Sequence, residues 1–292
     1  MKRESFGSRL GFILVSAGCA IGIGNVWKFP YICGAYGGAA FILIYLCFLV
    51  ILGIPVLVAE FAVGRGSHTS VAKCFDKLAP AGSGWKPLKF IGIIGCYMLM
   101  MFYTTVGGWM IYYCVKSLRG DFVGATPEAV TQSFSDMLGN APTMMLWMVI
   151  ICLIGFAVCF MGLQNGIEKI SKVMMSALLI IMVILAVHSV MMEGAGEGIS
   201  FYLIPDFQKI KEAGVGNVVF AALSQSFFTL SIGIGAMLIF GSYLDKSRSL
   251  TGEAVSITVL DTFVALTAGF IIIPACFAFG VEPGAGPGLV FI

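Results

Sequence analysis

The sequence predicts an all-α, polytopic membrane protein with about seven transmembrane helices. The chain has 292 residues, of which 59% are hydrophobic and only 11% charged, and its mean hydropathy is +0.99. An average soluble domain is about 45–50% apolar and about 25% charged. A soluble chain of this length could not bury so much apolar surface, which excludes an ordinary soluble enzyme. The net charge is only +2, so the chain does not have the strongly basic character typical of nucleic-acid-binding proteins.

Seven apolar segments are long enough to cross a bilayer, which takes about 20 residues. They cover residues 9–33, 39–64, 90–115, 143–161, 170–192, 215–243 and 253–280. The linkers are short, so one membrane domain is expected over residues 1–292. The polar stretch 65–90 predicts either a short interfacial helix or a solvated loop.

The loops between these segments differ in charge. Twelve Lys and Arg residues fall in the N-terminal tail and in the loops on the same side as segment 65–90, and five fall on the other side, where acidic residues also gather. Because basic loops stay in the cytoplasm, this asymmetry predicts a cytoplasmic N-terminus.

Two of the apolar segments are interrupted by small residues in their middle. The interruptions are Gly18, Gly22 and Gly24 in the first segment, and Ser231, Gly233 and Gly235 in the sixth. A broken helix at membrane depth is tolerated where it lines a cavity or water. Close packing of helices through small residues is the competing explanation.

Two facing breaks would form a site for a small zwitterion. A carboxylate would bind the backbone amides near Ile23 and Gly24, where a half-helix begins, and an ammonium group would bind carbonyls near Ala20 and Phe228, where half-helices end. Freed carbonyls also suit Na⁺, and Gly-interrupted segments are the best sequence indication of a transporter site.

Ionisable residues inside the membrane are functional candidates. Asp261 lies deep in the seventh segment and has no Lys or Arg near it in the sequence, so it needs a cation, a proton or hydrogen-bond donors. Gln225 and Thr229 are polar residues that could supply donors and oxygens. Glu60 lies nearer a segment end, where an interfacial position and an internal hydrogen bond compete with a role in transport. No catalytic constellation or nucleotide-binding loop is found, so neither an enzyme nor an organic cofactor is expected.

These residues lie in two long motifs of a known family. The motif SRLGFILVSAGCAIGIGNVWKFPYICGAYGGAAFILIYLCFLVILGIPVLVAEFAVGR, residues 8–65, strongly resembles the first two helices of the neurotransmitter:sodium symporter family. The motif SQSFFTLSIGIGAMLIFGSYLDKS, residues 224–247, resembles its sixth helix. The resemblance implies a leucine-transporter-type fold of two inverted five-helix repeats with helices 1 and 6 unwound. Residues 9–192 would form the first repeat and 215–292 a truncated start of the second.

The resemblance also implies a set of site residues. The first sodium site would use Ala20, Asn25, Thr229 and Asp261, and the second the carbonyls of Gly18 and Ile21. The substrate would contact Ala20, Ile23, Gly24, Leu99, Tyr103, Phe228, Thr229, Ser231 and Ile234. The gates would be Tyr103 and Phe228 with Lys28 on the outside, and Arg3 and Phe6 on the cytoplasmic side.

Asp261 departs from the family, which has Asn at this position. In chloride-dependent relatives, Tyr45, Gln225 and Thr229 belong to the chloride site, so Asp261 resembles a built-in substitute for the anion. The resemblance therefore implies a bacterial inner-membrane symporter that takes up Na⁺ with an amino acid, with a bulky aliphatic or aromatic one favoured, and needs no chloride.

Family members also carry helices beyond the seventh. Those helices would supply further sodium ligands and the partners of Lys28 and Arg3. The alternatives are therefore a non-transporting fragment, or half of a split transporter that pairs with separate C-terminal helices. A seven-helix receptor is a weaker alternative, because a cytoplasmic N-terminus and two broken helices argue against it.

Overall fold

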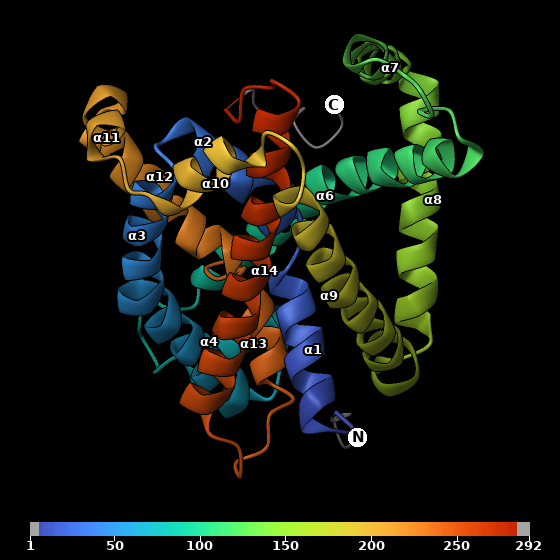
Figure 1. The fold of residues 1–292 in the computed structure, drawn as a ribbon. Coiled ribbons are helices and arrows are strands. Elements are labelled where there is room, and N and C mark those ends of the chain that lie inside the picture. The colour runs from blue at the N-terminus through green and yellow to red at the C-terminus, as the bar shows by residue number, and fades with distance from the viewer. Residues whose placement is uncertain (1–5, 285–292) are drawn as a thin grey trace.

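The computed structural model describes residues 6–284, and it is helical throughout that range apart from turns and loops (Figure 1). The first apolar segment forms α1 (Arg9–Ala20), η1 (Gly24–Lys28) and α2 (Phe29–Ala35). The second forms α3 (Ala39–Phe48), η2 (Leu49–Gly53) and α4 (Ile54–Ser67). The next three are α6 (Leu88–Arg119), α8 (Ala141–Phe160), and η3 (Leu163–Glu168) with α9 (Lys169–Val190). The last two are α12 (Val215–Thr229) with α13 (Ala236–Gly241), and α14 (Leu250–Ala278).

Among the described residues, five continuous helices are long and apolar enough to cross a membrane. The bent pair Arg9–Ala20 and Gly24–Ala35, with an angle of 53° at its break, makes a sixth. The predicted segment 215–243 differs from these, because α12 is only 15 residues long and a break separates it from α13. The all-α fold class is confirmed, and the two segments that contain small-residue interruptions are the two that break.

The polar stretches contain short helices. Segment 65–90 was expected to form either a short interfacial helix or a solvated loop. It contains a short helix, α5 (Val71–Leu78). α7 (Pro127–Gly139) follows α6, and Thr126 caps its N-terminus. A hydrogen bond from its own backbone N–H, assisted by the Thr126 hydroxyl, lowers the pKa of Glu128 in this first turn. Residues 192–214 form α10 (Ala195–Leu203) and α11 (Phe207–Ala213).

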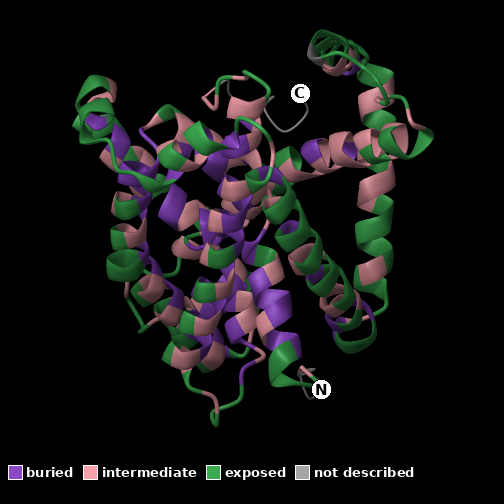
Figure 2. Cartoon of the chain, viewed as in Figure 1, coloured by how far each residue is buried: buried purple, intermediate pink, exposed green. Residues whose placement is uncertain are grey.

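α14 lies in the middle of the molecule, against α1, α2, α4, α9 and α10 (Figure 1). Half of the residues in the most apolar stretch of α14 are buried, whereas none of the residues in the corresponding stretch of α8 is buried. Figure 2 shows the same contrast, with purple residues gathered around α14 and α1 and mostly green and pink residues along α8. Outward-facing apolar side chains are expected of helices that contact lipid.

Glycines bring α4 and α13 into close contact. A methyl group on Gly64 would overlap the Leu238 carbonyl, and one on Gly241 would overlap the backbone of Phe61. Only a residue without a side chain allows backbones to approach so closely. This contact places the α4 side chains directly beside the break before α13.

Candidate functional site

The first break begins directly after Ala20. Ile21 adopts an extended conformation, and the N–H of Gly22 bonds to Asn25 Oδ1 at 3.3 Å. In a continuous helix the Gly22 N–H would donate to the Gly18 carbonyl. Here it donates to Asn25, so the Gly18 carbonyl is left without its helical partner. The helical backbone resumes at Gly24, so the break falls where the sequence predicts it.

The second break covers residues 230–235. Ser231, Gly233 and Gly235 have φ angles of 51°, 89° and 78°, in the left-handed region that favours glycine. The Ser231 hydroxyl donates a hydrogen bond to the Cys19 carbonyl at 3.1 Å. Ser231, predicted as a substrate contact, thus also joins the sixth segment to the first.

Glu60 of α4 anchors this second break. Its Oε1 accepts from the Gly233 N–H at 2.5 Å and its Oε2 from the Leu238 N–H at 3.2 Å. Backbone donors at the start of a helix lack intrahelical partners, and a carboxylate is favoured there. Of the alternatives for Glu60, the structure shows the internal hydrogen-bond partner.

Asn25, Thr229 and Asp261 form a fully buried polar cluster between η1, α12 and α14. Asn25 Nδ2 donates to Asp261 Oδ1 at 2.8 Å and to Thr229 Oγ1 at 3.0 Å, and Thr229 Oγ1 donates to Asp261 Oδ2 at 2.8 Å. Within residues 6–284 no Lys, Arg or His side chain forms an ion pair with Asp261. A buried carboxylate without a cationic partner is costly, and this oxygen-rich cluster is suited to a hard cation.

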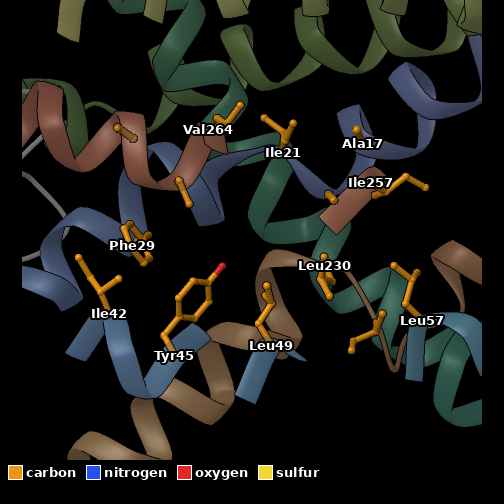
Figure 3. Close-up of a cluster of buried hydrophobic side chains, with 14 of the residues drawn as sticks. Ala17, Ile21, Phe29, Ile42, Tyr45, Leu49, Leu57, Leu230, Ile257 and Val264 are labelled. Atoms are coloured by element: carbon orange, nitrogen blue, oxygen red, sulfur yellow. The ribbon is translucent and has the colours of Figure 1, made fainter. Parts of the chain in front are cut away.

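Two further polar side chains lie near this cluster with unused hydrogen-bonding atoms. Gln225 Nε2 donates to the Gly24 carbonyl at 2.9 Å, while Gln225 Oε1 and the Tyr45 hydroxyl are buried without a hydrogen-bond partner among the described residues. The Tyr45 hydroxyl lies in the neighbourhood of Asp261. Figure 3 shows Tyr45 surrounded by apolar side chains, with its hydroxyl directed away from its own helix. The structure therefore brings Tyr45, Gln225 and Asp261, the residues expected around the substitute for chloride, into one region.

A cavity of about 210 Å³ lies beside the second break. Its lining contains five predicted substrate residues: Leu99, Tyr103, Phe228, Ser231 and Ile234. Three further lining residues of the sixth segment were not predicted from the sequence: Ser224, Phe227 and Ile232. These three residues are close in the sequence to the predicted contacts Phe228 and Ser231, and that proximity could have indicated them.

Phe228 also borders a second cavity of about 320 Å³, together with Ile23, Trp27, Lys28, Tyr31 and Phe102. The Lys28 ammonium lies 4.3 Å from the centre of the Phe228 ring. A methyl group on Gly24 would lie 2.8 Å from the same ring, so Gly24 is needed for the ring to fit. Phe228 is thus held between the two cavities, the position expected of a lid.

The first helix is held at its other end by two acids that the sequence analysis missed. Glu168 Oε2 accepts from the Gly7 N–H at 2.8 Å, and Glu253 Oε1 pairs with Arg9 Nε at 3.0 Å. Phe6, a predicted gate residue, packs edge-on against Phe12 and Tyr243. Arg3, the other predicted gate residue, lies outside the described residues. Glu168 and Glu253 are single acids at the starts of apolar segments, and that position could have indicated them as candidates.

Comparison with known families agrees with this geometry. The model of the sodium:neurotransmitter symporter family matches residues 3–143 and 128–281. The chain belongs to this family. Its members are transporters and not enzymes, so the chain is part of a multi-pass membrane transporter family.

Individual relatives of this symporter-family chain are also named as transporters. It is 37% identical over 290 residues to an uncharacterized sodium-dependent transporter of Bacillus subtilis, covering 99% of the chain and 63% of the relative. It is 34% identical to an uncharacterized sodium-dependent transporter of Haemophilus influenzae, with 99% and 65% covered. A sodium-dependent serotonin transporter of Drosophila melanogaster is 29% identical. The chain thus spans less than two thirds of the length of the bacterial relatives.

The fold matches a solved transporter structure. The crystal structure of MhsT in complex with L-phenylalanine aligns with a TM-score of 0.92 and 39% identity, over 100% of this chain and 65% of that one. The predicted fold with breaks in helices 1 and 6 is therefore confirmed.

Proposed function

We propose that this chain belongs to a symporter that couples Na⁺ entry to uptake of a hydrophobic or aromatic amino acid, without a chloride requirement. The observation that carries the proposal is Asp261, a buried carboxylate that has no cationic side chain as a partner among residues 6–284 and is located where two broken helices meet. The names of the relatives support the coupling ion, since several are called sodium-dependent transporters.

Sodium would bind at two places. At the first, the oxygens of Asn25, Thr229 and Asp261 would coordinate the ion with the Ala20 carbonyl, and the amide of Asn25 would have to turn away from Asp261. At the second, the carbonyls of Gly18 and Ile21 would contribute, and the loss of the helical partner of Gly18 supports this site. Both sites use oxygen ligands, which suit a hard cation.

The amino acid would bind between the two breaks. Its carboxylate would accept from the backbone amides at Ile23 and Gly24 and from the Tyr103 hydroxyl, and its ammonium would bind carbonyls near Ala20 and Phe228. The apolar lining of the 210 Å³ cavity, including Leu99 and Ile234, supports a bulky side chain. MhsT, the similar structure, was solved with L-phenylalanine.

Chloride independence follows from the charge of Asp261. Gln225 and Tyr45 face this region with unused polar atoms, so the region is polar but already contains a fixed negative charge. A second anion beside that carboxylate would be repelled. Asp261 would therefore do permanently what a bound anion does in chloride-dependent relatives.

Transport would proceed by alternating access across the bacterial inner membrane, with the N-terminus in the cytoplasm. Phe228 and Tyr103 would close the outer side, and the contacts of Glu168 and Glu253 with the start of α1 would close the inner side. Because the chain spans less than two thirds of its bacterial relatives, we propose that transport uses further helices, either from the same reading frame or from a second chain.

Binding of radiolabelled L-phenylalanine tests this proposal. Purified protein would be assayed in sodium chloride, sodium gluconate and potassium chloride, both alone and together with the further helices, supplied by the same reading frame or by a second chain. We expect binding in both sodium salts and little in potassium. Equal binding in potassium would refute sodium coupling, and binding that requires chloride would refute the role of Asp261.

A further inference from the structure

The corner between α5 and α6 carries an excess of positive charge at the end of a membrane span. Positions 65–89 contain five basic residues and one acidic residue: Arg65, Lys73, Lys77, Lys86, Lys89 and Asp76. α6 begins at Leu88 and is one of the spans, so the residues just before it lie at the membrane boundary.

Three of these basic residues are occupied by the fold. Arg65 Nη1 donates to the Arg248 carbonyl at 2.8 Å, and Lys77 Nζ donates to the Ser67 carbonyl at 2.7 Å. Lys89 Nζ pairs with Asp76 at 2.7 Å. The Lys89 pair neutralises the single acid of the corner, so Asp76 does not compensate the remaining lysines.

Lys73 and Lys86 are exposed, and within residues 6–284 neither ammonium group has a hydrogen bond or an ion pair. Lys73 precedes Asp76 by three residues on α5, and Lys86 precedes Lys89 by three residues. Because residues three apart on a helix are neighbours, the 2.7 Å ion pair places Lys73 close to this junction. Lys86 lies in the turn directly before α6, three residues before Lys89 in the sequence.

Exposed apolar side chains flank Lys86 in the sequence, at the start of the span. Trp85 is 61% exposed, and Phe90 and Ile91 in the first turn of α6 are 58% and 64% exposed. Tryptophan favours the headgroup level of a bilayer, and apolar residues below it suit the acyl chains. A methyl group added at Gly82 or Gly84 would have no other atom within 4 Å, so the loop before Trp85 is open.

We propose that Lys73 and Lys86, with Trp85, form a binding site for the headgroup of an anionic phospholipid. The two ammonium groups would bind the phosphate, and the Trp85 ring would lie at the junction of headgroup and acyl chain. Each lysine near an anionic surface strengthens binding by about fivefold. The site is separate from the substrate cavities and does not depend on sodium coupling.

Quenching of Trp85 fluorescence tests this site. The chain would be reconstituted in nanodiscs of phosphatidylcholine with a minority of phosphatidylglycerol, with bromine near the headgroup end of the acyl chains of one lipid or the other, at equal total bromine. The contribution of Trp85 is obtained as the difference in tryptophan fluorescence between the unaltered chain and the Trp85→Phe variant. We expect brominated phosphatidylglycerol to quench it at least about twofold more than brominated phosphatidylcholine.

The variants separate specific binding from general attraction. The double variant Lys73→Gln with Lys86→Gln should remove the excess quenching, whereas Lys246→Gln, which removes an exposed charge in the loop before α14, should leave it unchanged. Helical circular dichroism confirms that each variant is folded. Equal quenching by the two lipids in the unaltered chain, or an excess that survives in the double variant, would overturn the proposal.

Discussion

The amide nitrogen of Asn25 lies 2.8 Å from Asp261 Oδ1, although the two residues are 236 positions apart in the chain. Asn25 follows the break in the first segment, and Asp261 lies in the central helix α14. The contact therefore links the geometry of the break to the charge of a buried carboxylate. Any ion that binds Asp261 must compete with this hydrogen bond, which is how occupancy would be transmitted to the first helix.

Replacing Asp261 by Asn removes the charge while keeping the shape. A hydrogen bond to a charged group contributes about 1.5–3 kcal/mol, so we expect sodium-dependent binding of L-phenylalanine to weaken by about 10–100-fold in chloride-free buffer. Added chloride should restore part of the affinity. Asp121→Asn, at an exposed position, is the control. Full binding by Asp261→Asn without chloride would contradict the assigned role.

Glu60→Gln tests the anchoring of the second break. The neutral amide can accept only one of the two bonds from Gly233 and Leu238, and without charge assistance. We expect amide exchange at residues 230–235 to accelerate about 10–100-fold, as loss of about 1.5–3 kcal/mol implies. Hydrogen–deuterium exchange mass spectrometry measures this, with Glu193→Gln on an exposed loop as control. Unchanged exchange would show that Glu60 does not hold the break.

The sequence predicted the helices and breaks well, because both follow from local pattern. Apolar length defines a span, and clustered small residues mark the interruptions at 21–23 and 230–235. It left Glu60 undecided and missed Glu168 and Glu253, since the hydrogen bonds of an acid depend on which backbone groups reach it from other elements. Gly233 is 173 positions from Glu60, and no spacing rule connects residues so far apart.

Gly24→Ala tests the packing of the lid. The added methyl group would lie 2.8 Å from the Phe228 ring, so the ring must move. Overpacking costs about 1–3 kcal/mol, and we expect affinity for L-phenylalanine to fall roughly tenfold. Gly216→Ala, on the helix that carries Phe228 but with open space around it, should bind normally. Equal affinity in the two variants would show that Phe228 does not close the cavity.

Arg9→Gln tests the clamp on the start of α1. It removes the nearest cation from Glu253, which is 2% exposed, and leaves Arg248 at 4.0 Å. Since the Arg9 side chain is half exposed, we expect a coupling energy of only about 1 kcal/mol in a double-mutant cycle with Glu253→Gln. Thermal unfolding in detergent measures it, and Lys169→Gln serves as the surface control. A coupling energy of zero would mean that the ion pair does not hold α1.

Sodium-driven uptake tests the central claim most directly. Proteoliposomes would contain either the chain alone or the chain together with its further helices, supplied by the same reading frame or by a second chain, and would be given L-phenylalanine under an inward sodium gradient. We predict accumulation in at least one of the two preparations, and its loss when potassium replaces sodium. Accumulation at the same rate in potassium, or no accumulation in either preparation, would contradict sodium-coupled amino-acid transport.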